Sequence, residues 1–205
     1  MNTDPPSDRS TPAFPGLILA SGMSTRFGGK NKLLLPVDGI PIVRRTVSAY
    51  LEAQLSPVLV VVGYDASSVT ACIADLPIEI IRNPDFSGGQ STSLVRGVQN
   101  LPLDACAAII GVADQPFLTP HVIRLLIERY LSRHALIIAP TYRGSRGNPV
   151  LFDRSLFSEL ALVTGDQGGR GVIQAHQSDL LLVEIGDLIA GRDVDTPEDV
   201  SRLMD

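Results

Sequence analysis

The feature of the sequence that most restricts its fold is a series of short apolar runs, rich in β-branched residues, that alternate with amphipathic stretches. The clearest run, residues 57–63 (PVLVVVG), carries no charge, as is typical of a strand that is covered on both faces. Residues 41–54 and 120–132 have the apolar spacing of helices. Strands that alternate with helices predict an α/β fold of three layers, Rossmann-like, with a mostly parallel central sheet. The other predicted strands occupy residues 17–20, 78–81, 107–112, 136–139 and 180–184.

Composition and the first residues of the chain bound the class of protein. Residues 1–15 (MNTDPPSDRSTPAFP) are polar and rich in proline, so we expect a mobile N-terminal tail over 1–15 and a single domain over 16–205. The tail lacks the apolar segment of a secretion signal, and no apolar run reaches the roughly 18 residues of a membrane span. We therefore expect a cytoplasmic protein without a membrane partner. The net charge of -5 disfavours nucleic acid as a partner, because phosphate backbones attract basic surfaces.

The loop after the first predicted strand, residues 21–32 (SGMSTRFGGKNK), has the composition of a phosphate-binding loop. Its glycines allow the backbone to approach an anion closely, and successive backbone N–H groups form a cradle for phosphate oxygens. Arg26 and Lys32 would add charge-assisted hydrogen bonds. The loop matches neither the Walker A pattern nor G-x-G-x-x-G. The alternative interpretation is a flexible surface loop.

Two acidic positions are candidates for metal binding. Asp114 lies just beyond the run at 107–112, where ligands bind in α/β folds. Mg²⁺ prefers carboxylate oxygens together with substrate phosphates, so Asp114 is a candidate ligand; the alternative is a cap of the following turn. Asp195, with Asp193 close by, is a candidate second ligand. It precedes the helix-start pattern at 196–197, so the alternative is an acidic residue that complements the helix dipole.

Three further loops are rich in glycine and polar residues: 87–93 (SGGQSTS), 143–149 (RGSRGNP) and 164–171 (TGDQGGRG). Each alone is compatible with a mobile turn, but three in one short chain favour a ligand cleft. The first combines glycines and hydroxyls at the start of a helix, which suits hydrogen bonds to a sugar or a base. The sequence has no G-x-S-x-G, and its three histidines lie in helical or surface-like contexts, so we expect no Ser-His-Asp hydrolase.

Six segments, in order along residues 16–205, resemble the nucleotidyltransferases of molybdenum-cofactor maturation, and above all their molybdenum cofactor cytidylyltransferase branch. The first, LILASGMSTRFGGKNKLLLP (17–36), is similar to the family's opening pattern L-x-A-A-G-x-S-x-R-M-G-x-x-K-L-L-L-P. It departs from that pattern at Ser21, where cytidylyl enzymes usually carry Ala and guanylyl enzymes Gly, at Phe27 in place of Met, and by one extra residue before Lys32. The other segments are GQSTSL (89–94), ADQP (113–116), RGNPVLF (146–152), GDQGGR (165–170) and DVDTPED (193–199).

The resemblance implies a role for each matching position. Arg26, Lys32 and Asp114 are the implied catalytic residues: the two cations contact the triphosphate, and Asp114 binds Mg²⁺ with Asp195 as its second protein ligand. Lys30 is the alternative to Lys32, which is preferred because it directly precedes the LLLP run. The implied nucleotide-binding residues are Leu19, Ala20, Ser21, Gly22, Ser24, Arg26, Lys32, Gln90, Ser91, Ser93 and Asp114. The implied acceptor-binding residues are Arg146, Asn148, Pro149, Gly168 and Arg170.

The function that the resemblance implies is an Mg²⁺-dependent nucleotidyltransferase. It would transfer a nucleoside monophosphate, CMP from CTP, to the phosphate of molybdopterin or the molybdenum cofactor, with release of pyrophosphate. Such a phosphate is ionised at pH 7, so the protein needs no histidine base and mainly positions the reactants and neutralises charge. The partners would be the NTP, a phosphorylated pterin and a molybdoenzyme that receives the product. The alternatives are a sugar-phosphate nucleotidyltransferase, a relative with oxidoreductase activity, and a non-catalytic chaperone that binds nucleotide or cofactor.

Overall fold

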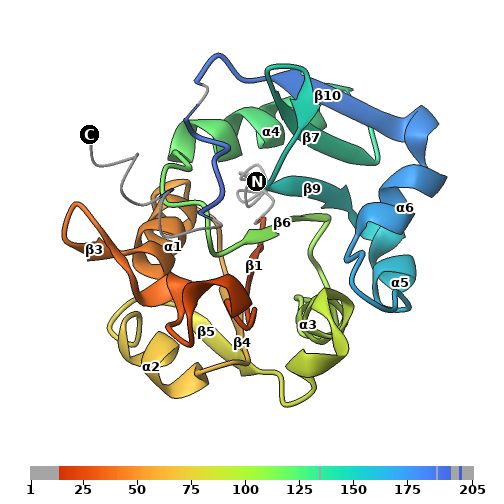
Figure 1. The fold of residues 1–205 in the computed structure, drawn as a ribbon. Helices are drawn as coiled ribbons and strands as arrows, with labels where there is room; N and C mark the ends of the chain where they lie inside the picture. The colour runs from red at the N-terminus through yellow and green to blue at the C-terminus, as the bar shows by residue number, and fades with distance from the viewer. Residues whose placement is uncertain (1–13, 134, 188, 195–198, 200–205) are drawn as a thin grey trace, which may run out of the picture.

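The computed structural model describes residues 14–133, 135–187, 189–194 and 199, which form a central sheet with helices on both sides (Figure 1). Among the described helices, none combines the length and the apolar composition that crossing a bilayer requires. The strands are β1 (Gly16–Ala20), β2 (Pro36–Val37), β3 (Ile40–Pro41), β4 (Val58–Val62), β5 (Glu79–Arg82), β6 (Ala107–Val112), β7 (Ile137–Tyr142), β8 (Ser145–Arg146), β9 (Val150–Asp153) and β10 (Leu180–Glu184). The α-helices are α1 (Ile42–Glu52), α2 (Ala66–Ala71), α3 (Gln90–Val98), α4 (Pro120–Arg133), α5 (Phe157–Leu160) and α6 (Arg170–Ala175).

The strands of the main sheet pair in the order β10-β7-β9-β6-β1-β4-β5, with β8 paired to β7 in addition. Strands β5, β4, β1 and β6 run parallel, and so do β7 and β10. Strand β9 runs antiparallel between β6 and β7. The predicted α/β fold with a mostly parallel sheet is confirmed. The antiparallel strand β9 was not predicted, because three apolar residues after a glycine-rich loop carry no signal of direction.

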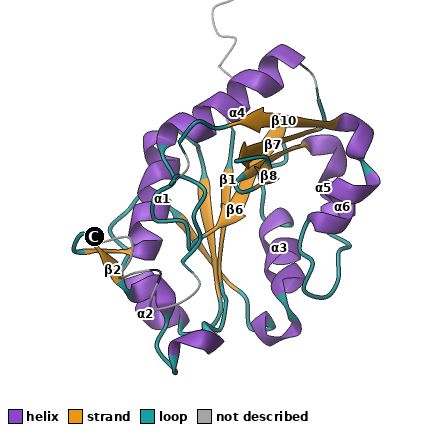
Figure 2. Ribbon diagram, turned by 45° about the horizontal axis from the view of Figure 1, so that its top comes forward, coloured by secondary structure: helices purple, strands orange, loops and turns teal. Residues whose placement is uncertain are grey.

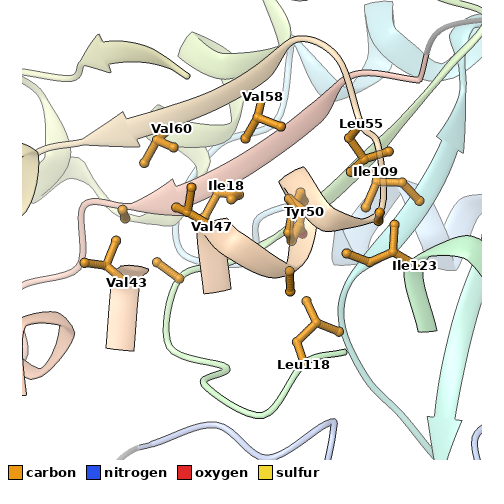
Figure 3. Close-up of a cluster of buried hydrophobic side chains, with 14 of the residues drawn as sticks. Ile18, Val43, Val47, Tyr50, Leu55, Val58, Val60, Ile109, Leu118 and Ile123 are labelled. Carbon is orange, nitrogen blue, oxygen red and sulfur yellow. The ribbon is translucent and has the colours of Figure 1, made fainter. Parts of the chain in front are cut away.

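The sheet is the middle of three layers, as predicted: α1, α2 and α4 cover one face, and α3, α5 and α6 cover the other (Figure 2). Side chains that alternate along β4 serve the two faces in turn. Val58, Val60 and Val62 pack with the α1 side, whereas Leu59 and Val61 pack with the α3 side. This two-sided burial is why the 57–63 run carries no charge. Figure 3 shows the α1 side, where Val58 and Val60 lie close to Val47 and Tyr50 of α1.

The packed part of the chain begins before the first strand. Phe14, which we expected in the tail, is only 6% exposed and packs edge-on against the ring of Tyr130 in α4. Its carbonyl accepts a hydrogen bond from the backbone N–H of Ser56, and the Pro15 carbonyl accepts one from Ile109. Residues 14 and 15 therefore belong to the core rather than to a tail. Burial of the large aromatic ring of Phe14 stabilises this segment, although the neighbouring residues are rich in proline.

The loops that carry the candidate site residues lie along one edge of the sheet, the edge formed by strand ends rather than by an outermost strand. The carboxyl ends of the parallel strands β1, β4 and β6 meet there, since Ala20 pairs with Val62 and Leu19 with Val112. Strand β9 starts at this edge, because it runs the other way and its first residue Val150 pairs with Ile110. The loop before β9 thus joins the loops after β1 and β6 at one edge.

Candidate active site

The loop after β1 folds back on itself and returns Lys32 to the sheet edge. Its turns use left-handed backbone at Ser24 (φ 51°), Gly28 (φ 59°) and Gly29 (φ 86°). Ser24 then closes the loop, because its Oγ accepts a hydrogen bond from the backbone N–H of Lys32 at 3.1 Å. Arg26 belongs to the short 3-10 turn Thr25–Phe27 within this loop, and its side chain lies outside what the structure describes.

Lys32 and Asp114 form an ion pair at the centre of the site. Lys32 Nζ donates to Asp114 Oδ2 at 2.5 Å, and the two side chains are 15% and 18% exposed. The other carboxylate oxygen, Oδ1, is buried and has no hydrogen-bond partner among the described residues. Asp114 therefore presents one neutralised oxygen and one oxygen that still lacks a donor or a cation.

The backbone around Asp114 is held from two sides. The hydroxyl of Thr46 in α1 lies 3.0 Å from the Ala113 carbonyl and 3.2 Å from the Gln115 carbonyl, so it bridges the residues on either side of Asp114. The Asp114 carbonyl in turn accepts a hydrogen bond from the backbone N–H of Val194 at 3.0 Å. This bond brings the C-terminal segment, far away in sequence, directly beside Asp114.

A cleft of about 440 Å³ opens between the loop after β1 and the start of α3. Lys32 and Asp114 line it, together with the aromatic ring-bearing Phe86 and the acidic Asp166. Its size lies within the range of small-molecule sites, roughly 300–1,000 Å³. The residues that we predicted to bind nucleotide and that line this cleft are Leu19, Ser21, Gly22, Ser24, Lys32, Gln90 and Asp114.

A second cavity of about 330 Å³ adjoins the first. The two share Leu19, Gln90, Val112 and Asp114, so Asp114 stands at their junction. The second cavity is formed by the loop before β9 and the loop before α6. It collects four of the five predicted acceptor-binding residues: Arg146, Asn148, Gly168 and Arg170.

Several predicted residues lie behind the cavities rather than in them. Pro149 is buried beside Gly111, whose missing side chain leaves room for its ring. Ser91 and Ser93 are each 1% exposed, and Ala20 is also buried. None of these four lines either cavity in the part of the chain that the structure describes. Their types matched the motif, but the direction of their side chains depends on how α3 and the sheet pack.

The start of α3 and the loop before α6 contact each other directly. The backbone N–H of Ser91 donates to the Gly165 carbonyl at 3.1 Å. Gly89 has a φ of +99°, and a Cβ at that position would lie 2.8 Å from the same carbonyl. Two of the predicted polar loops, 87–93 and 164–171, are therefore parts of one wall.

The segment after β10 reaches the second cavity at Asp193 and packs against Tyr142. The ring of Tyr142 lies against Gly147 and Gly191, where any side chain would collide with it, and its hydroxyl donates to the Asn148 carbonyl at 3.1 Å. Burial, reinforced by the carboxylates of Asp187 and Asp193, raises the pKa of Tyr142 above its ordinary value. Asp193 lines the second cavity, whereas Asp195 lies outside the described residues.

The donor set at Asp114 fits a hard divalent cation. Its buried Oδ1 lacks a partner among the described residues, and Mg²⁺ usually takes one or two carboxylates and completes its shell with water and substrate phosphates. No cluster of three or more histidine, cysteine, aspartate or glutamate side chains suited to a metal occurs among the described residues.

Three residues that shape the site were not among the predicted ones. Thr46 braces Asp114 from α1, Phe86 lines the larger cavity, and Asn83 hydrogen-bonds to Ser93 beneath it. Thr46 sits within an amphipathic helix and carries no local signal. Asn83 and Phe86 lie between a predicted strand and a predicted loop. Their roles become visible only from the way in which the neighbouring elements pack in the structure.

Comparison with known proteins identifies the family. The pattern of the MobA-like NTP transferase domain matches residues 16–180. Nicotine blue oxidoreductase of Paenarthrobacter nicotinovorans is 30% identical over 96% of this chain and 99% of that protein. The purine catabolism protein PucB of Bacillus subtilis is 27% identical over 92% of this chain and 95% of that protein. Molybdenum cofactor cytidylyltransferase of Escherichia coli is 26% identical over 91% of this chain and 93% of that protein.

Solved structures agree with the sequence comparison. The manganese complex of Rv0371c from Mycobacterium tuberculosis superimposes with a TM-score of 0.78 at 26% identity, over 94% of this chain and 98% of that chain. The likeness thus extends over nearly the whole of both chains. The match of sequence pattern, relatives and fold leads to one conclusion: the chain belongs to the MobA-like NTP transferase family.

Proposed function

We propose that the protein is an Mg²⁺-dependent nucleotidyltransferase that transfers CMP from CTP to the phosphate of a molybdopterin-type acceptor. The observation that carries the proposal is the position of Asp114 at the junction of two adjoining cavities, with one oxygen neutralised by Lys32 and the other buried with no hydrogen-bond partner among the described residues. A group-transfer enzyme needs two substrates to meet at one charged point, and this point lies between the two cavities.

The larger cavity suits the NTP. The glycine-containing loop after β1 lines it, and so does Lys32. The smaller cavity suits an anionic acceptor, because Arg146 and Arg170 line it. In this arrangement an oxygen of the acceptor phosphate forms a bond to the α-phosphorus. The bond from that phosphorus to the bridging oxygen of the β-phosphate breaks, and its electron pair leaves with pyrophosphate.

The side chains act on charge and position rather than on protons. Lys32 offsets negative charge that moves to the departing pyrophosphate, and Arg26 is proposed for the same task on the strength of its place in the opening motif. The acceptor phosphate attacks as an anion, so no residue has to remove a proton from it. Orientation of the two substrates across Asp114 is then the main contribution of the fold.

Asp114 would hold Mg²⁺ through the oxygen that lacks a partner, with Asp195 as the second protein ligand that the family resemblance implies. When bound, such an ion supplies Lewis acidity towards the phosphate oxygens. The manganese complex of the similar Rv0371c structure supports a divalent ion in this family. The preference for CTP and for a pterin acceptor rests on the opening motif and on the likeness to the Escherichia coli cytidylyltransferase.

A second candidate is an oxidoreductase, because the relative named nicotine blue oxidoreductase is 30% identical over nearly the whole chain. The sequence has no G-x-G-x-x-G fingerprint for a dinucleotide, and the loop after β1 has the composition of a phosphate-binding loop instead. A sugar-phosphate nucleotidyltransferase and a chaperone that binds nucleotide without turning it over are the remaining alternatives. Each of these candidates predicts a different outcome when the protein is incubated with NTP and an acceptor.

Pyrophosphate release distinguishes these candidates. The protein is incubated with Mg²⁺ and each of the four NTPs, with and without isolated molybdopterin, and with a sugar 1-phosphate in a parallel series. We expect release with CTP that depends on molybdopterin and exceeds release with GTP. Release that depends on the sugar phosphate would favour the sugar-phosphate alternative. Nucleotide binding without release under any condition would favour the chaperone, and oxidation of NADH or NADPH by a dye would favour the oxidoreductase.

A further inference from the structure

Beneath the larger cavity, a row of hydrogen-bonded side chains leads from the end of β5 to the cleft. Asn83, just beyond β5, donates to Ser93 Oγ of α3, which lies 2.5 Å from Ser21 Oγ in the loop after β1. Asn83 and Ser93 are 3% and 1% exposed, and among the described cavities neither lines one. Ser21 does line the larger cavity. The row therefore ends at a residue of the cavity lining.

The orientation of the Asn83 amide is set by the backbone. The N–H of Asp85 donates to Asn83 Oδ1 at 3.0 Å. A backbone N–H is only a donor, so the amide oxygen must face it and the amide nitrogen must face the other way. That nitrogen donates to Thr92 Oγ1 and to Ser93 Oγ, both at 2.9 Å. Both protons of the amide are thus in use.

The direction of the remaining protons follows from counting donors. Thr92 spends its hydroxyl proton on the Gly89 carbonyl, at 2.8 Å. Ser93 receives a proton from Asn83, and Ser21 Oγ is the one acceptor within hydrogen-bond distance of the Ser93 hydroxyl among the described residues. If Ser21 donated to Ser93 instead, the Ser93 proton would be buried without an acceptor, which is costly. Ser93 therefore donates to Ser21, and the proton of Ser21 is left for the cleft.

We infer that Asn83 is a positioning residue that makes Ser21 a hydrogen-bond donor to the nucleoside part of the substrate. This inference rests on the proposed function, because the ligand is taken to be an NTP. The atom that Ser21 recognises is then an acceptor, an oxygen or nitrogen of the base or an oxygen of the ribose. An alanine or a glycine at position 21 has no side-chain proton to offer, so this chain selects its nucleotide with a group of its own.

Asn83→Asp tests the direction of the row with almost no change in shape. A carboxylate still accepts from the Asp85 N–H, but it cannot donate to Ser93. Ser93 then donates to the carboxylate, Ser21 donates to Ser93, and the cleft meets lone pairs instead of a proton. We expect the Kd for the preferred NTP to rise about tenfold, and Ser21→Ala to give a similar loss. Calorimetric titration with CTP and with GTP, each with Mg²⁺, measures both.

The double variant separates positioning from general stability. If Asn83 acts through Ser21, then Asn83→Asp adds no further loss of affinity in a protein that already carries Ser21→Ala. Ser93→Ala breaks the same row, and its smaller loss of affinity should likewise disappear in the Ser21→Ala background. This second variant keeps the test open should Asn83→Asp not fold. If the losses of NTP affinity of the single variants multiply in both double variants, the inference is overturned.

Asp153→Asn is the matched control. It makes the reverse exchange of carboxylate and amide in another hydrogen-bonded pair, Asp153 with Tyr130, at the opposite end of the sheet. We expect a lower Tm and an unchanged Kd for NTP. An equal loss for CTP and GTP in Ser21→Ala assigns the contact to the ribose, and an unequal loss assigns it to the base. If the wild-type protein binds no NTP, the proposed function fails and the inference falls with it; if it does bind and Asn83→Asp and Ser93→Ala bind equally well, the inference alone is overturned.

Discussion

At the scale of single residues, the two oxygens of Asp114 have different surroundings although they belong to one carboxylate. Oδ2 accepts from Lys32, and Oδ1 is buried without a partner among the described residues. A buried acceptor without a partner costs about 1–3 kcal/mol, so a fold retains it only where something else is gained. In the proposed mechanism the gain is a vacant ligand position next to both substrates.

Asp114→Asn removes the charge and keeps the shape. We expect kcat for pyrophosphate release to fall by about 10²-fold or more, the order found for groups that stabilise charge in a transition state. Tm should change little, because the asparagine oxygen still accepts a hydrogen bond from Lys32. Asp75→Asn is the control: it breaks the exposed pair with Arg44, far from either cavity, and should leave kcat unaltered. Near-normal turnover of Asp114→Asn would remove this carboxylate from the mechanism.

The two lysines of the loop after β1 give a second prediction. Lys32 is 15% exposed and paired with Asp114, whereas Lys30 is exposed and does not line the larger cavity. Lys32→Ala should therefore weaken NTP binding and slow pyrophosphate release, while Lys30→Ala should do neither. Titration calorimetry and the release assay compare the two. A damaging Lys30→Ala together with a harmless Lys32→Ala would show that the extra residue of the loop has been placed wrongly.

At the scale of elements, the wall of the cleft depends on a close contact between the start of α3 and the loop before α6. Gly89 permits it by a positive φ and by its lack of a side chain, because a Cβ would lie 2.8 Å from the Gly165 carbonyl. Both loops contribute residues to both cavities: Gln90 lines each of them, and the loop before α6 places Asp166 in the larger cavity and Gly168 in the smaller one. A change at their contact should therefore affect both substrates together.

Gly89→Ala should destabilise the protein by about 1–3 kcal/mol, the usual cost of a strained backbone position, and should raise KM for NTP and for acceptor alike. Gly171→Ala is the matched control in α6, since a Cβ there meets nothing within 4 Å and its φ is not positive. That change should stabilise the helix by up to about 1 kcal/mol. Thermal unfolding and steady-state kinetics measure both. A Gly89→Ala protein with wild-type Tm and KM values would contradict the account of this wall.

At the scale of the whole molecule, the segment after β10 packs back against the candidate active site. Strand β10 is the outermost strand of the sheet on the side opposite β5. The segment after β10 nevertheless returns to Asp114, where the backbone N–H of Val194 donates to the Asp114 carbonyl. Gln115 adds a weaker hold through a hydrogen bond to the Gly191 carbonyl at 3.4 Å. Asp193 thus reaches the site because of the packing of a distant strand.

The fourth prediction concerns the metal. If Asp195 is the second protein ligand, Asp195→Asn should raise the Mg²⁺ concentration for half-maximal rate and leave the Tm of the metal-free protein almost unchanged. If Asp195 only complements a helix dipole, its loss should cost about 0.3–1 kcal/mol of stability and leave the Mg²⁺ dependence as it was. A Mg²⁺ titration of turnover, with Asp193→Asn and the double variant beside it, decides between these outcomes. EDTA should abolish turnover of the wild-type protein, and added Mg²⁺ should restore it.

Much of the fold was predictable from the order of its apolar runs. The charge-free run at 57–63 became β4, buried on both faces, and the run at 107–112 became β6, which leads to Asp114. The antiparallel β9 and the burial of Phe14 were not predictable. Strand direction depends on where a neighbouring strand offers unpaired backbone groups, and the fate of one aromatic ring depends on a partner, Tyr130, more than a hundred residues away.

The sequence by itself determined the residue types that the site needs and the loops that carry them, because the chemistry of glycines, cations and carboxylates follows from residue type alone. Asp114 and Lys32 were predicted in this way, whereas Arg146 and Arg170 were implied by the family resemblance. Only the tertiary structure decided which of Asp114's oxygens is left without a partner, that Ser93 turns towards Ser21 and not into a cavity, and that Val194 lies beside Asp114. These features arise where separate elements meet, and hydrogen-bond direction and burial at such a meeting point depend on both sides of it.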